Sequence, residues 1–273
     1  LQITKRCKQE FLFLTNSLKD KSLVIINKFN SSYINHQKIS ENRFDNFCKE
    51  MNEFLSDSKP DNFFLFDIDK IFLKNSLEKR IDYRYFLNSK SLYKLAFYKT
   101  YTKLIMPLID SFIGKTKKLI AIDCDNTLWG GIIGEDGVNN VQFGNSSSSA
   151  KIFTEIHYLL KSLANQGILL ALCSKNNIND VEDFFRKNTS SILRYEDFLI
   201  KKINWVDKAN NIIDISNELN IGTDSIVFID DSEFEINRVR SSFQGILTLK
   251  VPTNINEYPS SIRELSNFFL NLD

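Results

Sequence analysis

Two aspartates, Asp123 and Asp125, carry the strongest chemical signal in this sequence. They lie in the string LIAIDCDNT, in which an apolar run ends in the first acid and the second acid follows two residues later. The run is typical of a buried strand, so both acids lie where the chain leaves the strand and can point to one place. Carboxylates this close repel each other unless a cation or a proton lies between them. The pair therefore predicts a divalent metal site or an acid/base pair.

Further polar residues follow the apolar runs downstream. Ser174 comes directly after one such run, Lys208 opens a helical pattern, and Asp230 and Asp231 end another run. A hydroxyl, an ammonium group and an acid pair beside a nucleophilic carboxylate are the groups of a phosphoryl-transfer site, where catalysis depends on positioning and charge neutralisation. Taken singly they mean little, because an acid pair after a strand is usually a turn. Their order and context together predict one site.

The segments that carry these residues alternate between strand and helix patterns. Apolar runs and helical spacings follow one another from residue 119 onward, with runs at 119–123, 168–173 and 225–229 and helical spacings at 147–165, 180–187 and 207–219. Such alternation is typical of a doubly wound parallel α/β sheet with a three-layer, Rossmann-like arrangement. Ligands bind beyond the carboxyl ends of the strands in these sheets, which is where the polar residues fall.

The first half of the chain predicts a smaller α/β region. Its apolar runs at 22–27 and 62–68 flank a helical spacing at 41–55, which is a βαβ pattern, and a long amphipathic stretch covers 89–113. We expect an N-terminal α/β region over residues 1–116 and a catalytic domain over 117–273.

Charge is distributed unevenly between the two halves. Residues 1–118 carry 22 Lys and Arg against 13 Asp and Glu, the remainder carries 13 against 21, and the whole chain has a net charge of +1. Two surfaces that dock on each other explain this asymmetry as well as an acidic partner does. Lysines and aromatic residues alternate in the 89–113 stretch, but an ordinary amphipathic helix has the same spacing, so we expect no nucleic-acid binding.

The cysteines and the apolar runs bear on the compartment. The four cysteines form no CxxC pair, no secretory leader is recognisable, and no apolar run approaches the roughly 20 residues of a membrane span, so we expect a cytoplasmic protein without membrane association. Strand alternation predicts that Cys124 is a small buried hydrophobe. Cys173 directly precedes Ser174 and is a candidate reactive thiol.

A glycine-rich stretch follows the first two acids. No GxGxxG motif follows a strand there, so dinucleotide binding is not expected, and we expect a short hairpin flap over 131–143 with Trp129 packed beneath it. Few residues separate Ser174 from Lys208, which leaves no room for a large lid domain. A site without a lid can admit a bulky substrate or a protein-borne group.

The order of these signals resembles the haloacid dehalogenase (HAD) superfamily. Receiver domains use similar groups, but their acid pair precedes the phosphorylated aspartate, which counts against them. Over residues 117 to about 250 the chain is similar to the FkbH-like branch of HAD proteins, through the strings DNTLWGGIIGEDG, GILLALCSKNN, INWVDKANNI, ELNIGTDSIVFIDDSEFE and NRVR. The first half is only loosely similar to the tail of the SGNH-hydrolase-like region of that branch, and it holds no GDS-type nucleophile.

The resemblance implies a role for each residue of the site. Asp123 would be the nucleophile that forms an aspartyl-phosphate, and Asp125 the acid/base that protonates the leaving group and then activates water. Thr127 would support the loop and help to bind phosphate. Ser174 would bind a phosphoryl oxygen. Lys208 would neutralise the phosphoryl charge and orient the nucleophile.

The resemblance also implies a magnesium site. Asp231 would complete it with the carboxylate of Asp123 and the main-chain carbonyl of Asp125, while Asp230 would orient these ligands from behind.

For the family, the resemblance implies a phosphorylated three-carbon acid, 1,3-bisphosphoglycerate, as substrate, and loading of the glyceryl group as a thioester onto an acyl carrier protein, a reaction of polyketide biosynthesis. One alternative is a plain phosphatase acting on a small metabolite or a sugar phosphate. Another is a carrier-binding module without catalytic turnover, against which the complete set of site residues argues.

Overall fold

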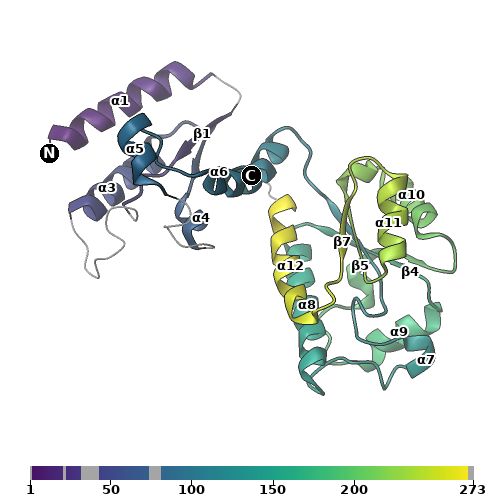
Figure 1. The fold of residues 1–273 in the computed structure, drawn as a ribbon. Helices are drawn as coiled ribbons and strands as arrows, with labels where there is room; N and C mark the ends of the chain where they lie inside the picture. The colour runs from purple at the N-terminus through teal and green to yellow at the C-terminus, as the bar shows by residue number, and fades with distance from the viewer. Residues whose placement is uncertain (1, 21–22, 32–42, 74–80, 270–273) are drawn as a thin grey trace. The chain divides into compact units, whose positions relative to one another are not determined.

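The protein is described by a computed structural model that covers residues 2–20, 23–31, 43–73 and 81–269 (Figure 1). By its contacts the chain divides into two compact units, Leu1–Met106 and Pro107–Asp273. The domain boundary that the sequence predicts at residues 116 to 117 stays a prediction.

The first unit is built on a parallel strand pair. Strand β1 pairs with β2 from Val24 opposite Phe63 to Asn27 opposite Phe66, and α3 provides the crossover between them, as the βαβ pattern predicts. The elements that begin in this unit are α1 (Gln2–Leu18), β1 (Val24–Asn27), α3 (Arg43–Ser58), β2 (Phe63–Phe66), α4 (Asp69–Leu73), α5 (Tyr83–Ser89) and α6 (Leu95–Phe112).

The second unit contains a five-stranded sheet in the order β5-β4-β3-β6-β7, and every pair in it is parallel. Its strands are β3 (Leu119–Ile122), β4 (Leu169–Ser174), β5 (Phe198–Ile203), β6 (Ile226–Asp230) and β7 (Leu247–Lys250). The predicted doubly wound parallel sheet is confirmed. The two edge strands, β5 and β7, were not anticipated from the sequence.

Helices cover both faces of this sheet. The α-helices are α7 (Ile133–Asp136), α8 (Ser148–Asn165), α9 (Ile178–Lys187), α10 (Lys208–Leu219), α11 (Glu233–Ser242) and α12 (Tyr258–Leu265), and 3-10 turns occupy Tyr195–Asp197, Thr223–Ser225, Ile255–Glu257 and Ser266–Phe269. None of the described helices has the length and apolar character needed to cross a membrane.

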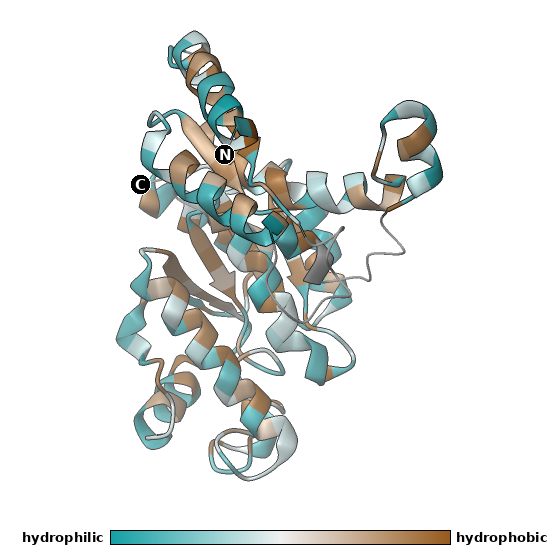
Figure 2. Ribbon diagram, turned by 90° about the vertical axis from the view of Figure 1, so that its left-hand side faces the viewer, coloured by the Kyte–Doolittle hydropathy of each residue, from teal (hydrophilic) through white to brown (hydrophobic). Residues whose placement is uncertain are grey.

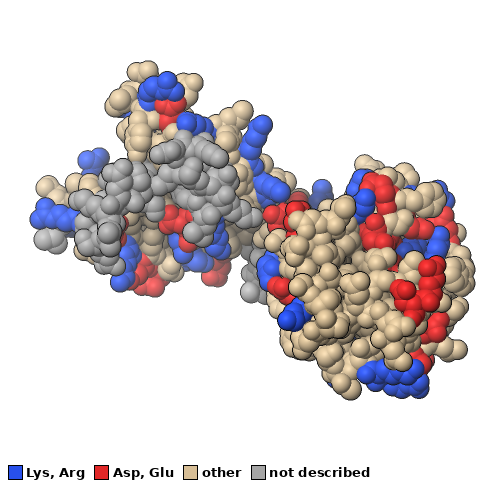
Figure 3. All heavy atoms as spheres, turned by 60° about the horizontal axis from the view of Figure 1, so that its bottom comes forward, with Lys and Arg blue, Asp and Glu red and all other residues tan. Residues whose placement is uncertain are grey.

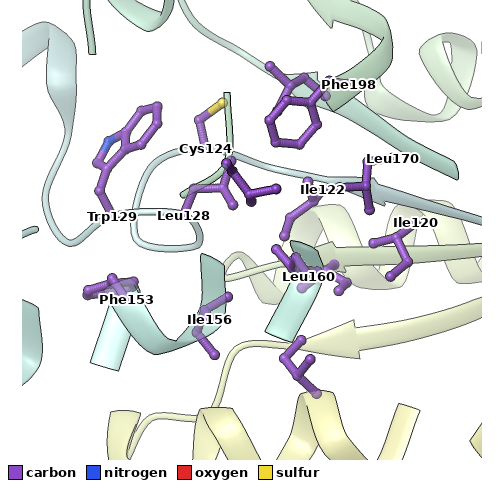
Figure 4. Packing of buried hydrophobic residues seen from close by; sticks show 14 of the residues in the cluster. Ile120, Ile122, Cys124, Leu128, Trp129, Phe153, Ile156, Leu160, Leu170 and Phe198 are labelled. Atoms are coloured by element: carbon purple, nitrogen blue, oxygen red, sulfur yellow. The ribbon is translucent and has the colours of Figure 1, made fainter. Parts of the chain in front are cut away.

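The central strand β3 is buried on both faces because its side chains alternate between two cores. Ile120 and Ile122 pack in one cluster with residues of α8, α9 and α12, including Leu160 (Figure 4). Leu119 and Ala121 pack in the opposite cluster with residues of α10 and α11. A strand buried on both faces has a continuous apolar sequence. In Figure 2 the strands are brown, whereas the helices alternate between brown and teal.

The loop after β3 closes on itself. An antiparallel bridge joins Gly130 to Gln142, and the segment between them contains the short helix α7 in place of the hairpin strands that the sequence predicts. Gly131 has a φ of +99°, and a Cβ there would lie 2.5 Å from a carboxylate oxygen of Asp136, so this position requires glycine. Trp129 is fully buried, and its indole packs against Phe184 and Phe185 of α9.

Candidate active site

The predicted site residues converge because neighbouring strands end together. Ile122 of β3 lies opposite Leu172 of β4 and Ile229 of β6, so the carboxyl ends of three adjacent strands share one edge. Asp123 follows β3 directly, while Ser174 and Asp230 are the last residues of their strands. This edge is the place where a doubly wound sheet binds its ligand.

A buried ammonium group joins two of the acids. Lys208, the first residue of α10, places its Nζ 2.8 Å from Oδ1 of Asp123 and 2.6 Å from Oδ2 of Asp230. All three side chains are at most 7% exposed. Burial by itself would lower the pKa of Lys208, but the two carboxylates outweigh it and hold that pKa well above its ordinary value, so the ammonium stays charged.

Three carboxylates form a cluster around this lysine. Oxygen atoms of Asp123, Asp230 and Asp231 lie within 4.8 Å of one another. Burial raises the pKa of Asp230 and of Asp231, and the charge of Asp123 raises both further. One ammonium group offsets only part of this negative charge, and the donor atoms are all oxygen, which is the set that Mg²⁺ prefers. The site therefore fits Mg²⁺.

Both carboxylate oxygens of Asp230 already accept hydrogen bonds. Its Oδ2 accepts from Lys208 Nζ, and its Oδ1 accepts from the main-chain N–H of Ser232 at 2.9 Å. These contacts are compatible with an orienting role, but the division into ligands (Asp123 and Asp231) and an orienting residue (Asp230) stays a prediction.

The side chain of Asp125 lies outside the acid cluster. Its Oδ1 accepts hydrogen bonds from Trp129 Nε1 at 2.9 Å and from the main-chain N–H of Ile133 at 3.0 Å, and its Oδ2 accepts one from Asn176 Nδ2 at 2.9 Å. Burial raises the pKa of this carboxyl, and the three N–H donors partly oppose the rise. The predicted metal contact of Asp125 involves its main-chain carbonyl and stays a prediction.

The two predicted hydroxyl residues are both buried but differ in their hydrogen bonds. Ser174 is 1% exposed, and its Oγ lies 3.4 Å from Nδ2 of Asn176. Thr127 is completely buried, and its Oγ1 has no hydrogen-bond partner among the described residues. This position fits support of the loop, while phosphate binding by Thr127 stays a prediction.

The structure argues against the candidate thiol. Cys173 is fully buried in the core with its Sγ 3.9 Å from the carbonyl of Lys208, and burial raises its thiol pKa far above the ordinary value. A thiol that is buried and protonated is not a nucleophile. Cys124 is also fully buried, as predicted from strand alternation.

His157 of α8 is a core residue. Its Nε2 donates to the carbonyl of Leu128 at 3.0 Å, and its Nδ1 lies 2.9 Å from the hydroxyl of Ser191. Burial lowers its pKa to about 3, so the ring is neutral and ties α8 to the loop after β3. His36 lies outside the described residues.

Three site residues were not assigned from the sequence. Trp129 and Asn176 hold Asp125, while Asn126 has a φ of +53° and accepts a hydrogen bond from the main-chain N–H of Gly131 at 2.9 Å. Asn176 belongs to a string that carries the family resemblance. Only its place two residues after Ser174 could have drawn attention to it.

A cavity of about 390 Å³ adjoins the acid cluster. It shares Asn126 and Asp231 with the site, and amides, hydroxyls and apolar groups line the rest of it. One cation, Lys250 at the end of β7, also lines it and pairs with Oε2 of Glu233 at 2.7 Å. The cavity has the size of a small polar molecule.

Comparison with known proteins adds a whole-chain likeness. No protein-family model and no curated protein matches the chain. Its structure is similar to that of the N-terminal part of protein BF1531 from Bacteroides fragilis, which contains a phosphatase domain and was crystallised with Mg. The two are 29% identical with a TM-score of 0.80, and the match covers 100% of this chain and 74% of that one.

Two further matches cover part of the chain. A HAD family enzyme from Bacteroides thetaiotaomicron, in complex with magnesium and inorganic phosphate, is 15% identical over 50% of this chain and 95% of that one, with a TM-score of 0.36. The 3-deoxy-D-manno-octulosonate 8-phosphate phosphatase from Moraxella catarrhalis is 18% identical over 62% and 94%, with a TM-score of 0.35. The whole-chain likeness shows that this chain shares its α/β fold with a protein that contains a phosphatase domain. The acids around Lys208 lie at the edge of the sheet where the sequence predicts the site.

Proposed function

We propose that the protein is a Mg²⁺-dependent phosphatase that acts through an aspartyl-phosphate on Asp123. The observation that carries this proposal is the buried Lys208, which holds one oxygen of Asp123 in place and leaves the carboxylate beside the acid cluster. Asp123 and Asp231 would hold the magnesium ion, and the ion would neutralise charge on the phosphoryl group. Ser174 would bind a phosphoryl oxygen, and Asp125 would exchange a proton with the leaving group.

Phosphate release from a panel of phosphorylated metabolites tests this function. The wild-type chain should release phosphate with Mg²⁺, and EDTA should stop the release until Mg²⁺ is restored. Asp123→Asn should abolish release, because an amide is not a nucleophile, while circular dichroism shows the same helix content. Turnover that survives in the Asn variant or in EDTA contradicts the mechanism.

For the substrate we propose a phosphorylated three-carbon acid such as 1,3-bisphosphoglycerate, as in the FkbH-like branch. The cavity beside the acids is small, and Lys250 offers a cation to a second anionic group. Its ion pair with Glu233 is partly exposed, with side chains 40% and 59% accessible, so exchange of that partner for a substrate anion costs little. A plain small-metabolite phosphatase is the alternative if no second anion is required.

For the product we propose a glyceryl thioester on an acyl carrier protein. The thiol sulfur of the carrier arm would bond to the acyl carbon of the substrate, the bond between that carbon and its phosphate group would break, and inorganic phosphate would leave. Water would then hydrolyse the phosphate ester that remains on the glyceryl group. Among the described residues only α9 and a 3-10 turn lie between β4 and β5, so no lid domain follows β4 that would exclude a tethered arm.

A surface of the first unit fits an acidic carrier. Helix α5 exposes Tyr83, Tyr85, Phe86 and Leu87, and residues 83–106 contain five Lys and Arg and no acid. One of the five, Arg84, pairs with Asp82 at 2.8 Å. On the visible face of each unit both Lys or Arg and Asp or Glu side chains are present (Figure 3). Exposed aromatic side chains within a region of one charge are typical of a docking surface for a partner of opposite charge.

Intact-mass analysis of a cognate carrier tests the loading step. Incubation with the enzyme and 1,3-bisphosphoglycerate should add one glyceryl group to the carrier arm. Release of free phosphate without a carrier adduct means that the enzyme is a plain phosphatase. If neither an adduct nor free phosphate forms, the result supports the non-catalytic binding module.

A further inference from the structure

The hydrogen bonds of Asp125 leave one acceptor position open on its carboxylate. Each carboxylate oxygen has two lone pairs, and Oδ1 uses both, for the N–H groups of Trp129 and Ile133. Oδ2 uses one lone pair, for the amide of Asn176. Among the described residues no other donor reaches this carboxyl, so the second lone pair of Oδ2 is the one that remains for a proton.

We infer that Trp129 and Asn176 are positioning residues that fix the carboxyl of Asp125, so that the proton exchanged with the leaving group is held on Oδ2. This inference rests on the proposed phosphatase function, in which Asp125 is the acid and base. The proton leaves Oδ2 for the oxygen of the leaving group, and a water molecule returns a proton to the same atom when it attacks the aspartyl-phosphate.

The support around Trp129 is rigid. The indole is fully buried, and its ring centroid lies 4.1 Å from that of Phe184 at an interplanar angle of 35°. A parallel bridge also joins the main chains of Asp125 and Trp129. Rotation of the carboxyl would break three hydrogen bonds at once, which holds Oδ1 and Oδ2 in their places.

Asn176 also sets the distance between the acid and the phosphate site. It is 6% exposed, and the same amide nitrogen that donates to Oδ2 of Asp125 lies 3.4 Å from the hydroxyl of Ser174. One amide group therefore holds Oδ2 in a fixed place relative to the hydroxyl that would bind the phosphoryl group. Proton transfer needs such precision, because it requires oxygen atoms about 2.6 to 3.2 Å apart.

The leaving group of the substrate separates positioning from simple loss of structure. The alkoxide that leaves glycerol 3-phosphate needs a proton, whereas the p-nitrophenolate that leaves p-nitrophenyl phosphate departs without one. Asn176→Ala and Trp129→Phe should lower kcat/KM on glycerol 3-phosphate about ten- to a hundredfold, and should change kcat/KM on p-nitrophenyl phosphate by less than about threefold. The comparison uses kcat/KM, which reports the steps up to departure of the leaving group, because hydrolysis of the aspartyl-phosphate is common to both substrates. Asp125→Asn removes the acid itself, so its ratio between the losses on the two substrates is the upper limit for the two positioning variants.

The chain supplies a matched control for each variant. Asn177→Ala alters the neighbouring asparagine, which bonds to Asp180, and Trp205→Phe alters the second tryptophan, which is 70% exposed. Neither control should change the ratio between the two substrates. Thermal unfolding is measured for all variants, and if Trp129→Phe does not fold, the comparison of Asn176→Ala with Asn177→Ala decides.

Two failures can be told apart. Equal losses of kcat/KM on both substrates, or a changed ratio of kcat/KM values in a control, overturn the positioning roles while the phosphatase function stands. A wild-type enzyme that releases phosphate from neither substrate nor from the metabolite panel overturns the proposed function and this inference with it.

Discussion

At the scale of single residues, Lys208 shows how the site balances charge. Its ammonium is buried between Asp123 and Asp230, and a buried ion pair that loses one partner leaves an uncompensated charge, which costs about 3 to 5 kcal/mol. The same group would meet the phosphoryl charge in the transition state. In the proposed mechanism, stability and catalysis would therefore depend on the same side chain.

We expect Lys208→Ala to lower kcat/KM more than Ser174→Ala does. A buried cation stabilises phosphoryl charge more than a neutral hydroxyl does, by about 1 to 2 kcal/mol, so the two variants should differ roughly five- to thirtyfold. Lys208→Ala should also lower the unfolding temperature. Steady-state kinetics below both unfolding temperatures checks the ranking, and the reverse order means that the lysine does not serve the phosphoryl group.

At the scale of elements, burial explains which strands could be predicted. The strands β3, β4 and β6 lie inside the sheet, so each reads as an apolar run. Strand β5 is an edge strand that includes Lys201 and Lys202, and β7 is a partly exposed edge strand, so neither gives such a run. The short helix α7 was missed because the glycines around it are equally typical of a hairpin.

The same reasoning applies to the site. Its acids could be predicted because strand ends in a parallel sheet meet at one edge, which sequence order alone makes visible. Asn176 could not, because its contact with Asp125 joins residues 51 positions apart and depends on how two loops fold. Adjacency to Ser174 likewise does not reveal the burial of Cys173, which argues against a reactive thiol.

The link between α8 and the catalytic loop predicts a pH-dependent stability. In the unfolded chain His157 has a pKa of about 6.5, and in the folded chain burial lowers it to about 3. Between these values the unfolded state takes up a proton that the native state does not. Above pH 6.5 His157 is neutral in both states, and its protonation does not change the free energy of unfolding. Below pH 6.5 the free energy of unfolding falls by about 1.4 kcal/mol per pH unit as the pH falls toward 3.

Urea unfolding of the wild-type chain and of His157→Gln between pH 7.5 and 4.5 measures this loss. The variant should be less stable at pH 7.5 and should lose less stability toward pH 4.5. His36 is common to both chains and cancels in the comparison. Parallel stability curves would mean that His157 is not the group responsible.

At the scale of the whole molecule, the positive surplus of residues 1–118 predicts a partner effect that depends on salt. Lys90 is exposed directly after α5, and Lys99 is exposed in α6. Lys94, between them, is half-buried. Changing all three to Glu should slow carrier loading, and the defect should shrink at high ionic strength, because charge complementarity mainly speeds encounter. Hydrolysis of a small phosphate should stay near the wild-type rate.

A second triple variant controls for net charge. Lys49, Lys59 and Lys70 are exposed in the same unit, and their change to Glu alters the charge equally at other places. An equal loading defect in both triple variants would show that α5 and α6 do not form the docking surface.

The chain contains two tryptophans in opposite surroundings, Trp129 at 0% exposure with its indole N–H on Asp125, and Trp205 at 70% exposure. Their fluorescence should therefore separate into a blue-shifted emission that aqueous quenchers do not reach and a red-shifted emission that they do. Trp205→Phe leaves a chain with a single tryptophan, which can be excited apart from the tyrosines and is hydrogen-bonded to the acid that would exchange the proton. Occupation of the site could then be followed in real time without any label.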